Sequence, residues 1–372
     1  MQKAKFHEKL TVGLFCGFLA VMALLYCFLP KLSFSETEKR QLAEAPVLNW
    51  ETLSSGQFGA DMETYMADHM PGRNFFVGLG AYYDLLSGRQ VSKDIYLADG
   101  GRLVEAPAAF DTAQLEKNMK YINKLAENLE IPVDLMLVPS AGYILQDHIS
   151  GLHDEYLDEA IISHIYSLAG SDVNTVDLLQ TYRNHAQKES LYYRTDHHWT
   201  SYGAFEAYRV YQAAVGGQSA EMDSFQVETH QGFLGSTYSR SALWLTKSES
   251  IELWQGSKLT VTIGEKTYDS AFFPDRLQEA DMYTVFLDGN QPVVRIRNEA
   301  NVGKGKLLVI RDSYANCIGP MLAESYEEVV MIDLRYYRLP ASALCAQEGF
   351  DRVLVLYSLS NFTTDANFPF LR

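Results

Sequence analysis

The pattern of apolar residues begins with one long uncharged stretch near the N-terminus. Residues 10–29 contain no charged side chain, and about 20 apolar residues are enough for a helix to cross a bilayer. Three lysines precede the stretch, whereas glutamates dilute the basic residues after it. This distribution favours a cytoplasmic N-terminus. A cleaved signal peptide is the alternative, but the stretch is longer than a usual signal core and no small-residue cleavage site follows.

We therefore expect residues 1–31 to be a cytoplasmic tail and membrane anchor of a single-pass cell-membrane protein with an extracytoplasmic main domain. Residues 32–110 follow as a linker and a lead-in helical segment, since apolar side chains recur at helical spacing until residues 68–73 break the pattern. The break contains an acid–histidine pair, Asp68 and His69. No nucleophile turn matches this pair, so we expect it to belong to the fold.

Strands and helices alternate in residues 111–372. Residues 112–129 form an amphipathic helical pattern, and residues 133–138 a buried strand. Further elements are expected as strands at 173–178, 306–310, 329–334 and 352–356 and as helices at 203–214 and 341–347. Alternation of this kind indicates an α/β domain with a parallel sheet.

Between about residues 225 and 301 the pattern changes to short strands separated by turn residues. The expected strands are 227–229, 251–254, 259–263, 283–287 and 293–296. An earlier pair, 95–97 and 102–104, predicts a small hairpin. We expect a β-rich insertion in the α/β domain, which either borders the active site or covers a sheet edge.

Composition limits the partners. The chain has 372 residues, a formal net charge of −16 and 47% hydrophobic residues, which indicates an acidic globular body with a sizeable core. Nucleic acid is excluded as a partner because no basic stripe offsets the charge. A strongly anionic polymer would be repelled unless it met a local basic groove. Cys317 and Cys345 lie in apolar helical contexts and are expected to be buried free thiols.

The first candidate for chemistry is the sequence Asp-His-His-Trp at residues 196–199, just before a predicted helix. An acid that fixes the tautomer of an imidazole, with the imidazole free to accept a proton, requires such residues on a rigid turn. Asp196 and His198 have this composition. Histidines near a helix start also act as caps or ion-pair partners, so the residues alone leave both interpretations open.

The second candidate is Ser313, which follows the apolar run at 306–310 and precedes a helix-compatible segment. A strand, a tight turn and a helix in this order expose a serine hydroxyl beside the amides of a helix N-terminus. A serine in this position can equally be an ordinary N-cap.

Residues 196–199 resemble the signature of the bacterial DHHW protein family, and residues 311–314, Arg-Asp-Ser-Tyr, fit its second block. That family is similar to the SGNH-hydrolase-like proteins that O-acetylate alginate and related exopolysaccharides. The resemblance implies that Asp196 orients, His198 is the base and Ser313 attacks. In ordinary SGNH hydrolases the serine block comes first, so the resemblance implies an SGNH-like three-layer α/β fold with permuted motif order. It covers most of the chain after the membrane segment.

The resemblance suggests further site residues. Asn361, after the last strand, stands where SGNH hydrolases place an oxyanion-hole side chain; a buried turn amide is the alternative, and the Ser313 backbone amide is a second oxyanion donor. Trp199 either stacks on a sugar ring or anchors the core. His197 is structural, substrate-facing or the true base, and Arg311 is a further substrate or oxyanion candidate.

The implied reaction is acyl transfer to a polysaccharide, with a membrane-bound exporter supplying the acyl donor and no cofactor. A carbohydrate esterase would use the same triad with water as acceptor, and a catalytically silent glycan-binding protein is the third alternative. Asp196, His197 and His198 also have metal-ligating side chains. Adjacent histidines are difficult to direct at one ion and no distant third ligand stands out, so we expect no metal.

Overall fold

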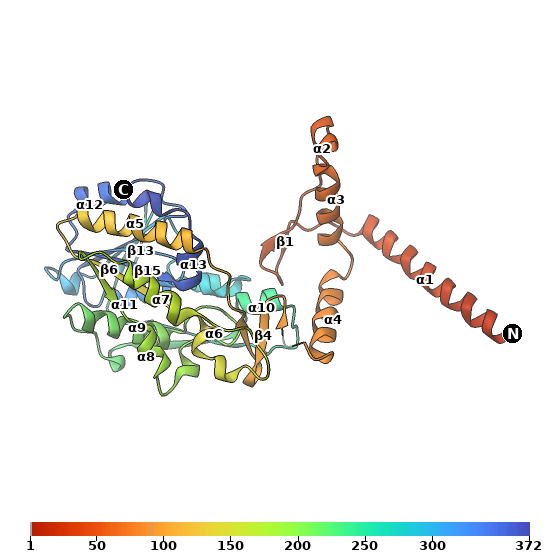
Figure 1. Cartoon of the computed structure of the whole chain (residues 1–372), viewed down its shortest axis with the longest axis horizontal. Coiled ribbons are helices and arrows are strands. Elements are labelled where there is room, and N and C mark those ends of the chain that lie inside the picture. Colours follow the sequence, from red (N-terminus) through yellow and green to blue (C-terminus); the bar gives the residue numbers. More distant parts are fainter. Residues whose placement is uncertain (1, 90) are drawn as a thin grey trace. The chain divides into compact units, whose positions relative to one another are not determined.

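The structure is a computed structural model that describes residues 2–89 and 91–372. The chain divides into two units (Figure 1). The N-terminal unit ends at Gly88 and also takes in Ala242–Trp244. The α/β unit contains Arg89–Ser241 and Leu245–Arg372. We describe each unit by itself.

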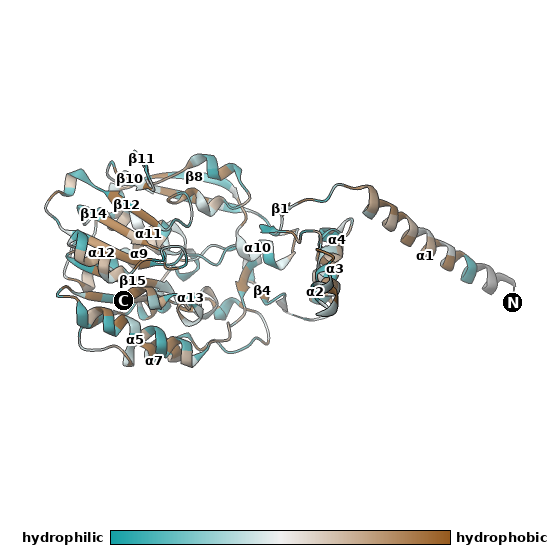
Figure 2. Ribbon diagram, turned by 90° about the horizontal axis from the view of Figure 1, so that it is seen from above, coloured by the Kyte–Doolittle hydropathy of each residue, from teal (hydrophilic) through white to brown (hydrophobic). Residues whose placement is uncertain are grey.

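The N-terminal unit is mainly helical. Its elements are α1 (Gln2–Phe28), the short strands β1 (Phe34–Ser35) and β2 (Arg40–Gln41), and helices α2 (Trp50–Ser54), α3 (Gln57–Asp68) and α4 (Arg73–Leu86). Within α1, the segment His7–Phe28 contains an 18-residue window with a mean hydropathy of 2.3 and is long and apolar enough to cross a membrane. The ribbon of α1 is mostly coloured as hydrophobic in Figure 2. The predicted break between α3 and α4 is confirmed.

Within this unit, Asp68 at the end of α3 binds the linker segment that contains Arg40 and Ala43. Its carboxylate accepts hydrogen bonds from Arg40 Nη1 at 2.9 Å and Nη2 at 2.5 Å, and from the Ala43 amide at 2.9 Å. The hydrogen bond from Arg40 is the main reason that the pKa of Asp68 falls to about 2. His69 Nε2 lies 2.9 Å from the Ala43 carbonyl oxygen. The Asp68–His69 pair therefore serves the fold in this unit.

The α/β unit is built on an eight-stranded sheet with the order β11-β10-β12-β14-β13-β15-β6-β7. Five strands run parallel: β14 (Glu328–Ile332), β13 (Lys306–Arg311), β15 (Arg352–Ser358), β6 (Val133–Val138) and β7 (Val173–Val176). The other three, β12 (Val293–Arg297), β10 (Thr260–Ile263) and β11 (Lys266–Tyr268), extend one edge by antiparallel pairing. The predicted parallel sheet is thus mostly parallel, with an antiparallel edge.

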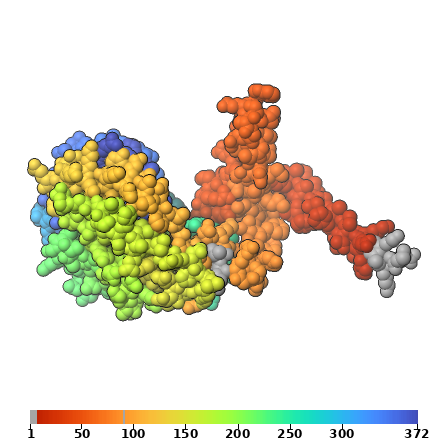
Figure 3. Space-filling view, viewed as in Figure 1, coloured from red at the N-terminus to blue at the C-terminus, as the bar shows by residue number. Residues whose placement is uncertain are grey.

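Helices cover both faces of this sheet. The chain leaves β13 through α11 (Ala315–Leu322) to β14, then returns through α12 (Ala341–Glu348) to β15 on the other side of β13. Right-handed crossovers in opposite directions put α11 and α12 on opposite faces. Figure 1 shows α5 (Thr112–Asn128) with α12, and α9 (Ser201–Ala214) with α11. The α5 helix and the C-terminal segment are neighbours on the surface in Figure 3.

The expected β-rich insertion is only partly correct. Strands β8 (Gln226–Phe233) and β9 (Glu249–Gln255) form a separate antiparallel ribbon, whereas β10 and β12 belong to the main sheet. The strand expected at 283–287 is wrong: Met282–Val285 forms a 3-10 turn. Tyr283, Val285, Phe286 and Leu287 are all buried, because a compact turn places successive side chains in the core where a strand would alternate them.

Other elements follow the sequence pattern. Strands β4 (Ile95–Ala98) and β5 (Arg102–Glu105) form the predicted hairpin. Cys317 and Cys345 are buried free thiols, as expected. Burial raises the pKa of the Cys317 thiol to about 12, so the group is inert at neutral pH.

Candidate active site

Asp196, His197 and His198 lie on a loop that is closed by the β-bridge between Tyr192 and Trp199, just before the start of α9. The Tyr193 amide donates to the His198 carbonyl oxygen at 3.2 Å, which closes the loop on itself. Thr200 caps α9, because its hydroxyl accepts a hydrogen bond from the Gly203 amide at 3.0 Å. These contacts make the rigid turn that the sequence predicts.

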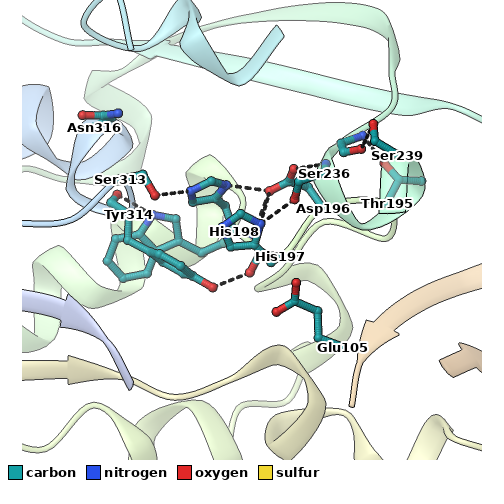
Figure 4. A network of polar contacts seen from close by, with 12 residues as sticks. Glu105, Thr195, Asp196, His197, His198, Ser236, Ser239, Ser313, Tyr314 and Asn316 are labelled. Carbon is teal, nitrogen blue, oxygen red and sulfur yellow. Dashed lines mark hydrogen bonds and ion pairs between the residues drawn. The ribbon is translucent and has the colours of Figure 1, made fainter. Parts of the chain in front are cut away.

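Ser313 reaches this loop from the end of β13. His198 Nε2 lies 2.8 Å from Ser313 Oγ, and His198 Nδ1 lies 2.6 Å from Asp196 Oδ1 (Figure 4). Asp196 and His198 are buried, whereas Ser313 is partly exposed. A carboxylate on one ring nitrogen and a hydroxyl on the other form the arrangement of a Ser-His-Asp triad.

Asp196 is held on three sides. Its Oδ1 accepts the His198 amide at 2.8 Å, and its Oδ2 accepts the Ser236 amide at 2.6 Å. A Cβ added to Gly235 would lie 2.2 Å from Asp196 Cβ, so only glycine fits there. Burial alone would raise the pKa of Asp196, but the nearby imidazoles and these hydrogen bonds outweigh it and hold the pKa well below its usual range.

A carboxylate from β9 fixes the residues just before Asp196. Glu249 Oε1 accepts from the Thr195 amide at 2.7 Å and from the Thr195 hydroxyl at 2.6 Å, while its Oε2 accepts from the Arg194 amide at 2.9 Å. Strand β9 and the segment that connects β8 to β9 therefore position the loop. Sequence reasoning missed Glu249. Gly235 and Ser236 belong to the Gly-Phe-Leu-Gly-Ser sequence at 232–236, which the family resemblance placed at the border of the active site without indicating their contacts.

Two rings enclose the His198 imidazole. Tyr283 stacks on it with centroids 3.8 Å apart and planes at 8°, and His197 lies 3.9 Å away at 36°. His197 Nδ1 contacts Ser236 Oγ. Desolvation, followed by the charge of His198, lowers the pKa of His197. Ser313 contacts His198, so of the two adjacent histidines His198 is the one placed to act as its base.

Asn361 is not directed at Ser313. Its Nδ2 donates to Asp312 Oδ2 at 2.8 Å, an oxygen that also accepts from the amide and hydroxyl of Ser358. The other oxygen, Oδ1, accepts from the Tyr314 amide at 3.0 Å. Asn361 therefore acts as a partly exposed turn amide that fixes Asp312, beside the nucleophile. In the described part of the chain no hydrogen bond uses the Ser313 amide, which stays a candidate oxyanion donor.

Trp199 and Arg311 are core residues. Trp199 is fully buried and its Nε1 donates to the Tyr314 carbonyl oxygen at 3.0 Å, so its ring anchors the loop and presents no face to a sugar. Arg311 is also fully buried, with its Nη1 3.7 Å from Asp333 Oδ2. Of the two alternatives for Trp199, its burial favours the core anchor. Burial also argues against substrate contact by Arg311, and its strand-end position in the sequence does not reveal this.

Asp196, His197 and His198 offer ligand atoms that lie within 4.8 Å of one another. Both nitrogens of His198 are already used, Nδ1 by Asp196 and Nε2 by Ser313. His197 Nδ1 contacts Ser236 Oγ. A metal ion would therefore have to displace the hydrogen bonds of the triad, and the geometry favours proton transfer over metal ligation.

Comparisons with solved structures support the fold. Among solved structures, a DHHW family protein from Eubacterium siraeum has a TM-score of 0.64 and 23% identity over 75% of this chain and 95% of its own. PatB1 of Bacillus cereus, solved with a sulfonyl adduct, has a TM-score of 0.63 and 21% identity over 75% and 98%. The O-acetyltransferase domain of Pseudomonas putida AlgJ has a TM-score of only 0.47 and 14% identity over 73% and 93%, too low to support an argument.

A search of curated proteins finds no match. The family model described as "DHHW protein" matches residues 109–332, which is more than half of the chain and contains both the Asp196 loop and Ser313. The resemblance inferred from the sequence is confirmed, and the chain belongs to the DHHW protein family.

Proposed function

We propose that this protein is a membrane-anchored, extracytoplasmic enzyme that transfers an acyl group, such as acetyl, to a polysaccharide through an acyl-serine intermediate on Ser313. The observation that carries the proposal is the continuous hydrogen-bonded chain from Asp196 through His198 to Ser313 Oγ, at 2.6 and 2.8 Å. A serine hydroxyl is a weak nucleophile unless an adjacent base takes its proton, and this chain supplies the base.

In the first half-reaction, the proton of Ser313 Oγ moves to His198 Nε2 as Oγ bonds to the acyl carbonyl carbon. The leaving oxygen of the donor departs with that proton. In the second half, a sugar hydroxyl gives its proton to His198 and attacks the acyl group, and Ser313 Oγ leaves and takes the proton back. Asp196, ionised because its pKa is low, stabilises the imidazolium in both halves. The Ser313 amide is the proposed donor to the oxyanion.

Two further points support the proposal. The similar structure of PatB1 holds a sulfonyl adduct, and sulfonyl groups attach to activated nucleophiles, as expected of an acyl-transfer site. Helix α1 has the length and hydropathy of a membrane span, which would keep the α/β unit near an extracytoplasmic polysaccharide. We propose a membrane-bound exporter as the source of the acyl donor, since an acyl donor made in the cytoplasm must cross the membrane to reach this site.

The experiment measures the cleavage of an aryl acetate by the full chain in detergent, first without an acceptor and then with polysaccharide fragments as acceptors. Wild type should release the aryl alcohol, and Ser313→Ala should lose at least about 10³-fold in rate. Acetylated glycan, detected by mass spectrometry only with wild type, would support the transferase. If wild type and Ser313→Ala release the aryl alcohol at the same rate, the proposal is wrong.

A carbohydrate esterase is the second candidate, because the partial exposure of Ser313 admits water to the same triad. It predicts that acetylated glycans lose acetyl groups to water, and that added acceptor hydroxyls do not change the product. The ratio of acetyl transferred to acetyl hydrolysed, measured against acceptor concentration, separates the two reactions. A catalytically silent glycan-binding protein predicts no turnover in any of these assays.

A further inference from the structure

A cavity of about 90 Å³ lies beside the triad in the α/β unit. It is bordered by Asp196, His197 and Tyr314 on one side and by residues that follow the carboxyl ends of β6 and β15, including Pro139 and Ser360, on the other. Ligands of open α/β sheets bind outside these strand ends. Ser313 and His198 are not among its lining residues, so the cavity suits a part of the substrate that does not react.

The charges around the cavity are acidic. Glu105, Glu155 and Asp158 line it together with Asp196, and no lysine or arginine of the described residues does. Glu105 pairs with Arg240, which lies outside the lining. Burial raises the pKa of Asp158, which favours its neutral form. His197 also lines the cavity, but its lowered pKa favours the neutral imidazole. A carboxylate ligand would therefore lose its hydration in the cavity without gaining a positive partner.

The cavity wall also contains a polar group without a partner. Thr237 is fully buried and lines the cavity, and its Oγ1 has no hydrogen bond. Buried hydroxyls are nearly always satisfied, so a ligand or water is expected to complete this one. The other lining residues are largely apolar, such as Leu103, Pro107 and Phe110. Apolar walls with a few polar groups are typical of sites that bind small molecules.

We infer that this cavity is a subsite for a flanking sugar of the acceptor polysaccharide, and that it selects an uncharged glycan over one built from uronic acids. The inference rests on the proposed function. An uncharged arm, such as a hydroxymethyl or acetamido group, would lie against the apolar wall and hydrogen-bond to Thr237 Oγ1. The volume is sufficient for several water-sized groups.

The test measures binding by the full chain in detergent with Ser313→Ala, so that no reaction occurs. The two ligands are the tetrasaccharide of N-acetylglucosamine, which is uncharged, and tetragalacturonate, titrated by calorimetry at the same ionic strength. We expect the uncharged tetrasaccharide to bind at least about tenfold more tightly. Thr237→Val should weaken its binding about fivefold, the effect of losing one hydrogen bond. Thr262→Val, on strand β10 and outside the cavity lining, is the matched control and should have no effect.

A charge reversal completes the test. Glu155 and Glu265 are both exposed, and Glu265 lies on the turn between β10 and β11, outside the cavity lining. Glu155→Lys should strengthen tetragalacturonate binding about tenfold, and Glu265→Lys, with the same change in net charge, should not. Equal binding of the two tetrasaccharides, binding of neither, or equal effects of the paired variants would overturn the inference. Because binding is measured without the nucleophile, these results do not depend on whether wild type transfers acyl groups.

Discussion

Asp196 and Asp68 each precede a histidine in the sequence, but their partners in the structure differ. Asp196 meets the Nδ1 atom of His198, whose Nε2 reaches Ser313. Asp68 meets the guanidinium of Arg40, and the neighbouring His69 contacts a backbone carbonyl oxygen. Asp196 is therefore linked through His198 to a hydroxyl that can give up a proton. Asp68 is paired with an arginine, which stays protonated.

The comparison shows that an acid–histidine pair becomes chemically useful only through a third group. At the Asp196 site this group is Ser313, which follows strand β13 and lies 115 residues beyond His198 in the chain. At the Asp68 site the third group is an arginine, which holds the linker against the α3–α4 junction. Both acids have lowered pKa values, so a perturbed pKa alone does not distinguish catalysis from structure.

The largest difference between the two acids is expected when each is replaced by asparagine. Asp196→Asn should lower kcat on an aryl acetate by about 10³- to 10⁴-fold, because the amide favours the wrong tautomer of His198. Asp68→Asn should leave kcat within about twofold and instead lower the stability of the N-terminal unit. Steady-state kinetics and thermal unfolding of both full-length variants check this. Similar kcat losses in the two variants would mean that the acids do not have separate roles.

A smaller loss is expected from Gly235→Ala. The new Cβ would meet Asp196 Cβ at 2.2 Å and Oδ2 at 2.3 Å, so the carboxylate must move away from His198. We expect about a 10- to 100-fold fall in kcat, since a displacement of about 1 Å is enough for such an effect. Gly59→Ala, where nothing lies within 4 Å of the added atom, is the control. Unchanged activity of Gly235→Ala would show that this contact does not fix Asp196.

The two adjacent histidines provide the next test. His198→Gln should reduce kcat by at least about 10³-fold, because it removes the general base that Asp196 only orients. His197→Gln should cost at most about tenfold, because the ring stacks on His198 without contacting Ser313. The kcat values of the two variants, compared with wild type, measure the difference. The reverse order would identify His197 as the base.

The smallest effect concerns acid stability. The pKa of Asp68 is about 2 in the folded protein, below its ordinary value of 3.8. A depressed carboxyl pKa stabilises the fold above the ordinary value, and this contribution disappears as pH falls through about 2. Arg40 is 41% exposed, so solvent screening limits the effect to about 1 kcal/mol. Unfolding of the N-terminal unit, followed from pH 5 to 2, should show this loss in wild type and not in Asp68→Asn.

The sequence predicted those parts of the site that have a local pattern. The loop at 196–199 and the strand–turn–helix at Ser313 are short segments whose residue types and order indicate their roles. The supporting groups have no such pattern. Ser236 lies 40 residues from Asp196, and Glu249 lies 54 residues from Thr195. They meet the loop only because the β8–β9 ribbon folds back onto it, which depends on packing over a long range.

The same limit applies to the sheet and to Asn361. The residues of β10 and β12 have the composition of strands, but nothing local shows that they pair antiparallel with the edge of a parallel sheet. An asparagine after a strand end can donate to an oxyanion or to a carboxylate, and the position of Asp312 decides between them. Side-chain partners of this kind follow from the fold and not from the motif.

The central claim is that Ser313 is the activated nucleophile, and covalent labelling tests it most directly. The full chain in detergent is treated with an aryl sulfonyl fluoride, and the modified residue is located by peptide mass spectrometry. We predict one sulfonyl group on Ser313 of wild type, much slower labelling of His198→Ala, and none on Ser313→Ala. Folded wild-type protein that stays unmodified, or that carries the group on Ser236 instead, would contradict the account.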